Sequence, residues 1–212
     1  MEDIKPLIQL SAIEQRILGS LLEKSRATPD YYPMSINSLT AACNQKTSRN
    51  PVVNYDEETV TLTLNALKIK GLASTVTGAG SRTVKWKHNL AIVYPLLPSE
   101  LVIVCLLLLR GPSTPGEINT NSGRLYEFET IEEVQETLQK LATDEPAFVK
   151  QLAKRPGQKE ARYMHLFGGG QEEETPEPET TSPVFSNTDL EDRVAKLEQE
   201  VQELKEMINL LL

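Results

Sequence analysis

The stretch 56–88 changes from a helical pattern of apolar residues to an alternating one. Its first apolar residues recur at intervals of four and three: Val60, Leu64 and Leu67. This spacing predicts an amphipathic helix that begins after Asp56, a common capping residue, and ends at Gly71. Alternation then predicts strands over 72–76 and 82–88, joined by a glycine-rich turn. Helix, turn and β-hairpin in this order are typical of a winged helix.

The same pattern returns downstream at a constant offset of 74 residues: Val134, Leu138 and Leu141. Thr130 and Glu133 have the spacing of a capping box at the start of this second helix. Two strands are predicted after it, over 147–152 and 161–167. Each predicted hairpin closes with a histidine: His88 and His165. Two copies in register predict a tandem duplication of the winged-helix unit.

Further helix starts are predicted at residues that commonly cap helices: Ser11, Ser35, Ser99 and Thr114. Ser11 and Thr114 are each followed three residues later by a glutamate, which completes a capping box. Ser99 is expected to cap an apolar helix over 100–110. Residues 44–55 are expected to connect the second helix to the helix that starts after Asp56.

We therefore predict a mainly α fold with small β-hairpin wings, in the α+β class. Two winged-helix units are expected at 8–96 and 97–167. A disordered, acidic and proline-rich linker is expected at 168–189, followed by a coiled-coil helix at 190–212. The two units are expected to pack through the far side of helix 56–70, which would otherwise expose three apolar residues: Leu62, Ala66 and Ile69.

The C-terminal helix carries an unbroken heptad pattern: Leu190, Val194, Leu197, Val201, Leu204, Ile208 and Leu211. Leucine at d and β-branched residues at a favour two parallel strands. Arg193 would face Glu198 of a partner helix, and Glu200 would face Lys205, so both pairs are opposite in charge. We therefore predict a homodimer through this coiled coil. The alternative is that the helix folds back onto the globular part of its own chain.

The formal net charge is −8, and the acidic excess lies after residue 168, so neither predicted unit is strongly basic. Cys43 and Cys105 are expected to be buried thiols in a reducing cytoplasm. The chain has no apolar run long enough for a membrane span and no leader pattern at its N-terminus. Because the sequence shows no metal-ligand spacing and no cofactor motif, we predict neither a metal nor a cofactor.

Five motifs carry a family resemblance: LGSLLEKSRATPDYYPMS, LTAACNQKTSRNPV, GSRTVKWKH, LLRGPSTPGEI and RPGQKEARYMHL. In this order, over about residues 8–167, they resemble the YceH family of bacterial tandem winged-helix proteins. The resemblance implies the double winged-helix fold and a cytosolic bacterial setting. It implies no enzymatic activity, because the biochemical role of that family is unassigned. The C-terminal helix lies outside the resemblance.

The first functional hypothesis is a DNA-associated, transcription-regulator-like protein of the helix-turn-helix type. Winged helices commonly place their third helix in the major groove, where three polar residues of helix 56–70 are candidates for base contacts: Thr61, Asn65 and Lys68. Basic residues on the two wings are candidates for phosphate contacts: Arg82, Lys85, Lys87, Lys154, Arg155, Lys159 and Arg162. The recognition-type helices also carry exposed glutamates, so we expect weak binding to double-stranded DNA through the wings of a dimer.

The alternative is a protein-interaction adaptor that uses the winged-helix faces and makes no direct DNA contact. The apolar arc of helix 56–70 exceeds half of its circumference, which is typical of a helix that is covered by a domain or a partner. An enzyme is not predicted, because the sequence shows no nucleophile–base spacing and no phosphate-binding loop. GAGSR leads into a strand, whereas a phosphate cradle opens onto a helix.

Overall fold

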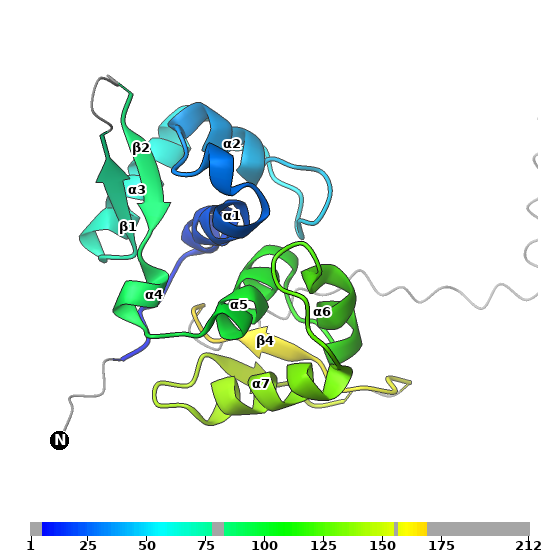
Figure 1. Ribbon diagram of the computed structural model, residues 1–212. Helices are drawn as coiled ribbons and strands as arrows, with labels where there is room; N and C mark the ends of the chain where they lie inside the picture. The colour runs from blue at the N-terminus through cyan, green and yellow to red at the C-terminus, as the bar shows by residue number, and fades with distance from the viewer. Residues whose placement is uncertain (1–5, 78–82, 155–156, 169–212) are drawn as a thin grey trace, which may run out of the picture. The chain divides into compact units, whose positions relative to one another are not determined.

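The computed structural model describes residues 6–77, 83–154 and 157–168, which belong to one compact unit (Figure 1). These ranges contain seven α-helices, one short 3-10 helix and two antiparallel hairpins. The predicted mixture of helices with two small hairpins is thereby confirmed. The predicted coiled coil, including every proposed dimerisation residue, lies outside the described residues, as does the predicted linker apart from Gly168.

The first half of this unit has three helices followed by a hairpin: α1 (Ala12–Ala27), α2 (Ile36–Cys43), α3 (Glu57–Ile69), β1 (Ala73–Val76) and β2 (Lys85–His88). A 3-10 helix, η1 (Pro29–Tyr31), follows α1. Beyond the β1–β2 ladder, the backbones of Met34 and Trp86 exchange two hydrogen bonds of 3.0 and 2.7 Å. The segment before α2 therefore adds a short third edge to the hairpin.

The second half repeats this order: α5 (Pro98–Arg110), α6 (Pro115–Ser122), α7 (Ile131–Thr143), β3 (Val149–Gln151) and β4 (Tyr163–His165). Ser113 and Tyr163 exchange backbone hydrogen bonds of 3.0 and 2.9 Å, as Met34 and Trp86 do in the first half. A short helix, α4 (Leu90–Val93), joins the halves and was not predicted. This repeated order is compatible with two winged-helix units.

Most of the predicted helix starts are confirmed. Ser11 with Glu14 and Thr114 with Glu117 each form both hydrogen bonds of a capping box. Asp56 accepts a hydrogen bond of 2.7 Å from the Thr59 amide at the start of α3. The helix ends in a turn in which Gly71 has a φ of 77°.

Two predicted caps are wrong in detail. The helix α5 begins at Pro98, so Leu97 is its N-cap in place of Ser99, and its amide donates to Glu100 Oε2 at 2.7 Å. Proline suits the first helical position, because it has no amide hydrogen and an amide hydrogen there would have no partner within the helix. At α7 the Glu133 carboxylate accepts from the amide of Glu129, not from that of Thr130.

The two halves pack together through α1 and α5, which lie side by side in Figure 1. The apolar residues 101–109 of α5 are all buried. Gly19 permits the close approach, because a Cβ built there would lie 2.9 Å from Leu109 Cγ. The Cys105 thiol donates to the Gly19 carbonyl at 3.4 Å. A small residue at a helix crossing thus determines how the halves meet.

The predicted packing through the far side of α3 is wrong. Leu62 is 65% exposed and Ile69 is 88% exposed, so the second half does not cover this face. The reason is that α3 packs on α1 and α2 through one stripe: Val60, Leu64 and Leu67. The apolar α5 instead packs against α1 at Gly19, where the backbones can approach closely.

Candidate interaction surfaces

The outward face of α3 combines apolar and polar side chains. Successive helical residues are rotated by about 100°, so four exposed residues lie opposite the buried stripe: Glu58, Leu62, Asn65 and Ile69. The two large aliphatic side chains are seven residues apart, and this spacing places them on one line along the helix. We call these four residues the α3 face.

Two of the three predicted base-contacting residues are engaged within the protein. The Thr61 hydroxyl donates to the Glu57 carbonyl at 2.6 Å, and Lys68 Nζ lies 3.5 Å from Thr75 Oγ1 on β1. Asn65 is exposed on the α3 face between Leu62 and Ile69. A DNA groove approaching this face would therefore meet two aliphatic side chains and the Glu58 carboxylate.

The corresponding face of α7 is polar. Its buried stripe is the predicted one: Val134, Leu138 and Leu141. At the same offset of 74 residues, Glu136 occupies the position of Leu62, and Thr143 occupies that of Ile69. Both residues are exposed, and Glu132 repeats Glu58. The scaffold therefore accepts polar residues at these two positions.

The wing of the first half presents positive charge. Strand residues alternate between faces, so Lys85 and Lys87 lie on the side of β2 opposite the buried Trp86. Lys85 is exposed and Lys87 is half-buried. Arg82, the third predicted phosphate contact of this wing, lies outside the described residues.

The wing of the second half has mixed charge. Arg162 forms a 2.8 Å ion pair with Glu117 and donates to the Pro112 carbonyl at 2.8 Å. Lys154 and Lys159 line a shallow depression of about 520 Å³ that also contains two carboxylates, those of Glu136 and Glu160. Arg155 lies outside the described residues. The predicted basic character is therefore weaker here than on the first wing.

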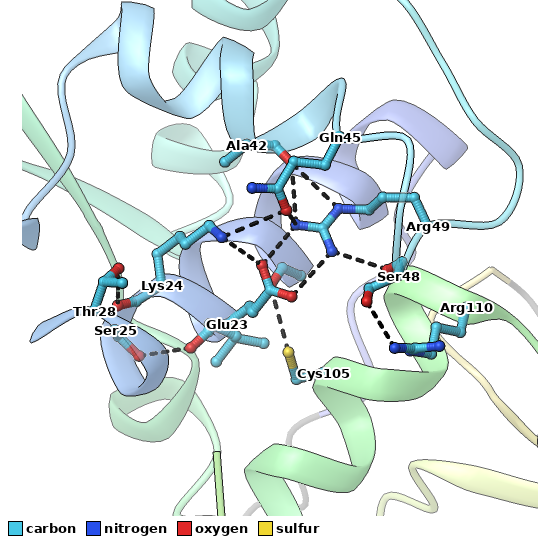
Figure 2. Close-up of polar contacts among 12 residues, drawn as sticks. Glu23, Lys24, Ser25, Thr28, Ala42, Gln45, Ser48, Arg49, Cys105 and Arg110 are labelled. Carbon is cyan, nitrogen blue, oxygen red and sulfur yellow. Dashed lines mark hydrogen bonds and ion pairs between the residues drawn. The ribbon is translucent and has the colours of Figure 1, made fainter. Parts of the chain in front are cut away.

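A buried polar cluster fixes the loop that precedes α3 (Figure 2). The Arg49 side chain is 0% exposed and donates two hydrogen bonds to the Glu23 carboxylate, at 2.6 and 3.0 Å. Arg49 also donates to the Ala42 carbonyl, at 3.0 and 3.2 Å. Burial would raise the pKa of Glu23, but the Arg49 guanidinium keeps that pKa below its ordinary value. The pair ties the loop and the end of α2 to α1.

The same loop also reaches the second half. Arg110 of α5 donates to the Ser48 hydroxyl at 2.8 Å, and the Asn50 amide donates to the Leu109 carbonyl at 2.8 Å. Arg16 of α1 donates to the Cys43 carbonyl at 3.1 Å. These contacts hold the segment between α2 and α3 on both halves, so α3 starts from a fixed position. The arginines of this anchor stand far apart in the sequence, so no spacing rule indicates that they contact one segment.

The two matching histidines are half-buried and neutral. His88 pairs with Ala73 across the first hairpin, and His165 pairs with Val149 across the second. Burial lowers the pKa of each to about 4, helped at His88 by nearby Arg26 and Lys87. Among the described residues, neither Nδ1 atom has a hydrogen-bond partner. The two hairpins therefore hold the same neutral residue at matching places.

The contact between Ser25 and His88 does not have the geometry of a catalytic pair. The Ser25 hydroxyl donates to the Leu22 carbonyl at 2.7 Å, so it accepts from His88 Nε2, which lies 3.3 Å away. A serine nucleophile would need the reverse direction, with its proton directed at the ring nitrogen. Burial also raises the pKa values of Cys43 and Cys105, so both remain thiols.

The described residues give no candidate for a metal site or a membrane span. They hold no group of three or more histidine, cysteine, aspartate or glutamate side chains placed to bind a metal ion. No helix within them has the length and apolar character needed to cross a bilayer. The α3 face and the two wings are the candidate surfaces for a macromolecular partner.

Comparison with known proteins identifies the family. The family model described as "Protein of unknown function, DUF480" matches residues 10–158. A UPF0502 protein of Shewanella piezotolerans is 47% identical over 209 residues, covering 95% of this chain and 96% of its own. Another, of Pectobacterium carotovorum, is 44% identical and covers 96% and 98%. A third, of Opitutus terrae, is 44% identical and covers 95% and 85%.

These matches extend the family resemblance that the motifs indicated. The alignment with the Shewanella relative covers 95% of this chain. The unmatched remainder is shorter than the segment after residue 168, so the similarity extends into that segment. The names of these relatives state no enzymatic activity. By its match to the family model and by these bacterial relatives, the chain belongs to the DUF480 (UPF0502) family.

Proposed function

We propose that this chain is a non-enzymatic protein-interaction adaptor, built from two winged-helix units, that binds a protein partner through the α3 face. One observation carries the proposal: Leu62 and Ile69 are exposed where α7 has Glu136 and Thr143. Covering a leucine or isoleucine side chain stabilises a complex by about 1.5–3 kcal/mol. Because the scaffold tolerates polar residues at these positions, the aliphatic ones are best explained by a partner.

The polar residues of the α3 face suggest the chemistry of that partner. Glu58 and Asn65 flank the aliphatic line, and both offer acceptor oxygens. We therefore expect the partner to present an apolar patch edged by lysine, arginine or amide donors. The anchored loop before α3 supports this role, because a fixed helix loses little conformational freedom on binding.

Capture from a lysate of the native bacterium tests the proposal. The bait variant carries Leu62→Glu and Ile69→Thr, which transfers the α7 residues onto α3. The matched control carries Glu136→Gln and Thr143→Ser, which changes two residues at the same positions of α7. With nuclease present, we expect wild type and control to retain a common protein and the α3 variant to lose it. Equal retention by all three baits would contradict the proposal.

The second candidate is DNA association, which Lys85 and Lys87 on the first wing favour. Among the described residues, neither lysine forms an ion pair with a carboxylate, whereas Arg162 on the second wing does. Phosphate contacts of this kind give weak binding that is independent of sequence and steeply dependent on salt. A homodimer through residues 190–212 would present two first wings and strengthen such contacts. A cytoplasmic location is part of both candidates.

Fluorescence anisotropy with a labelled duplex distinguishes the DNA candidate. Charge reversal at Lys85 and Lys87 should abolish binding to the duplex at low salt. Asn65→Ala should weaken binding only to a duplex of preferred sequence. Charge reversal at Lys154 and Lys159 should have the smaller effect, because carboxylates share their depression. Binding unchanged by the Lys85 and Lys87 reversals would remove this candidate.

A further inference from the structure

A small pocket lies where the two halves meet. Its volume is about 310 Å³, at the low end of the range for small-molecule sites. Its apolar wall comes from α1, α5 and the segment after α6: Leu22, Leu101, Val102 and Leu125. The polar residues that line it are Ser25, Arg26, Tyr32 and His88. Among the described residues, the lining contains no acidic side chain.

The polar groups of the pocket divide into satisfied and available ones. Ser25 and His88 are hydrogen-bonded to each other, and the Ser25 proton goes to the Leu22 carbonyl. The Tyr32 oxygen accepts from the His88 amide at 2.7 Å, and within the described residues its own proton has no acceptor. Burial raises the pKa of Tyr32 to about 12, so the hydroxyl keeps this proton at neutral pH.

Arg26 supplies the second available donor. It is exposed at the end of α1 and lines the pocket, and its charge lies close enough to His88 to lower the pKa of that ring. The pocket therefore offers one cation and one neutral hydroxyl above an apolar wall. Guanidinium and hydroxyl donors together suit a carboxylate.

We propose that this pocket binds a small apolar monocarboxylate, with its carboxylate at Arg26 and Tyr32 and its body on the apolar wall. A cationic ligand would find no carboxylate among the described lining residues. A phosphorylated ligand would place more charge against the apolar wall than one arginine neutralises. A neutral apolar molecule would give the Tyr32 hydroxyl no hydrogen-bond acceptor and the Arg26 guanidinium no opposite charge. Because the wall comes from both halves, an occupied pocket joins them.

Titration calorimetry on the full chain tests the proposal, with benzoate and hexanoate as probes. The neutral probes of similar shape are benzamide and hexanol. We expect dissociation constants of about 1 mM for the carboxylates, given their few non-hydrogen atoms. A charge-assisted hydrogen bond changes the dissociation constant roughly tenfold to hundredfold. The neutral probes should therefore bind at least tenfold more weakly than the carboxylates.

Two pairs of variants locate the site. Arg26→Gln should weaken the binding of benzoate at least tenfold. Arg124→Gln removes the same charge outside the lining and should leave benzoate binding unchanged. Ala91 is exposed and lines the pocket, so Ala91→Phe should block binding without disturbing the core. Ile92→Phe places the same ring one residue away, outside the lining, and should leave binding unchanged.

Three results would overturn the proposal: no saturable binding of either carboxylate up to about 10 mM, equal binding of the neutral probes, or carboxylate affinity unchanged in Arg26→Gln and Ala91→Phe. Melting temperatures of the four variants, measured without ligand, identify any that fails to fold. The Arg26 pair still decides the matter if Ala91→Phe proves unstable.

Discussion

The helices α3 and α7 occupy the same place in two similar halves, but they present different faces to the surroundings. Each buries three apolar residues at the same spacing, and each is followed by an antiparallel hairpin. On the outward side, α3 has Leu62 and Ile69 where α7 has Glu136 and Thr143. The buried stripe is what the fold requires, and the outward face is free to differ. A function of the outward face is therefore expected of one half only.

The halves also differ in how their arginines are used. Arg49 in the first half is fully buried against Glu23, whereas Arg162 in the second half forms a partly exposed pair with Glu117. A buried guanidinium depends on its partner, because charge without compensation is costly in the interior. The largest energetic difference between the halves should therefore lie at these two ion pairs.

Replacement of one partner in each pair sharpens this comparison and should give the largest effect. Glu23→Gln leaves the buried Arg49 charge uncompensated, and we expect a loss of about 3–5 kcal/mol in the free energy of unfolding. Glu117→Gln should cost at most about 1 kcal/mol, because exposed pairs contribute little. Urea unfolding of both variants measures the difference. Equal losses would show that the two pairs are equivalent.

The contact between the halves gives the next largest effect. Gly19→Val places a Cβ about 2.9 Å from Leu109 Cγ, and we expect a loss of about 1–3 kcal/mol from overpacking. Gly123→Ala is the matched control, since a Cβ there meets no atom within 4 Å. Thermal unfolding of both variants checks this. A Gly19→Val protein as stable as wild type would mean that α1 and α5 do not approach as described.

The two histidines are a feature that both halves share. Each has a pKa of about 4 in the fold and 6.5 when unfolded, so the unfolded chain binds more protons between these values. Stability should therefore fall as the pH drops from 6.5 to 4, by up to about 3 kcal/mol for each histidine. Glu23 should add its own loss at lower pH, because its pKa is below its ordinary value.

Urea unfolding at pH values between 4 and 7 measures the histidine contribution. The double variant His88→Gln and His165→Gln should flatten the dependence in this window. The single variants should each remove about half of it, because the two sites are alike. An unchanged slope in the double variant would mean that other groups titrate there.

The proposed coiled coil of residues 190–212 belongs to neither half, and its removal should have the smallest effect on their stability. The heptad pattern of 190–212 spans little more than three heptads, so association should be marginal and concentration-dependent. We expect full-length protein to sediment as a dimer at tens of micromolar, an order-of-magnitude choice for a short coil. A truncation after Gly170 should be monomeric. A monomeric full-length chain, or a dimer that survives truncation, would contradict the coiled coil.

Local signals in the sequence predicted local structure well. The caps at Ser11, Asp56 and Thr114 and the two buried stripes of α3 and α7 follow from short-range hydrogen bonding and periodicity, so they were confirmed. The prediction that Leu62 and Ile69 lie in a contact between the halves is wrong, because periodicity identifies apolar residues without showing what covers them. The role of Gly19 was missed, because a glycine within a helix gives no sign of the helix that crosses it.

Long-range polar contacts had no comparable signal. Glu23 and Arg49 are 26 residues apart and belong to a helix and a loop, so no spacing rule pairs them. Met34 and Ser113 each add a short third edge to one hairpin. Each edge is a single bridge, so it is too short to produce an alternating pattern of apolar residues in the sequence. The α3 face became a candidate only when the structure left it exposed beside its polar counterpart on α7.

Site-specific photocrosslinking in cells tests the adaptor proposal most directly. A photoreactive phenylalanine analogue is placed at Leu62 or Ile69 on α3 and, in separate strains, at Glu136 or Thr143 on α7. All four positions are exposed, so the analogue does not disturb the core. We predict a discrete protein adduct from both α3 positions and none from the α7 positions. The absence of an adduct from α3, or equal adducts from both helices, would contradict the account.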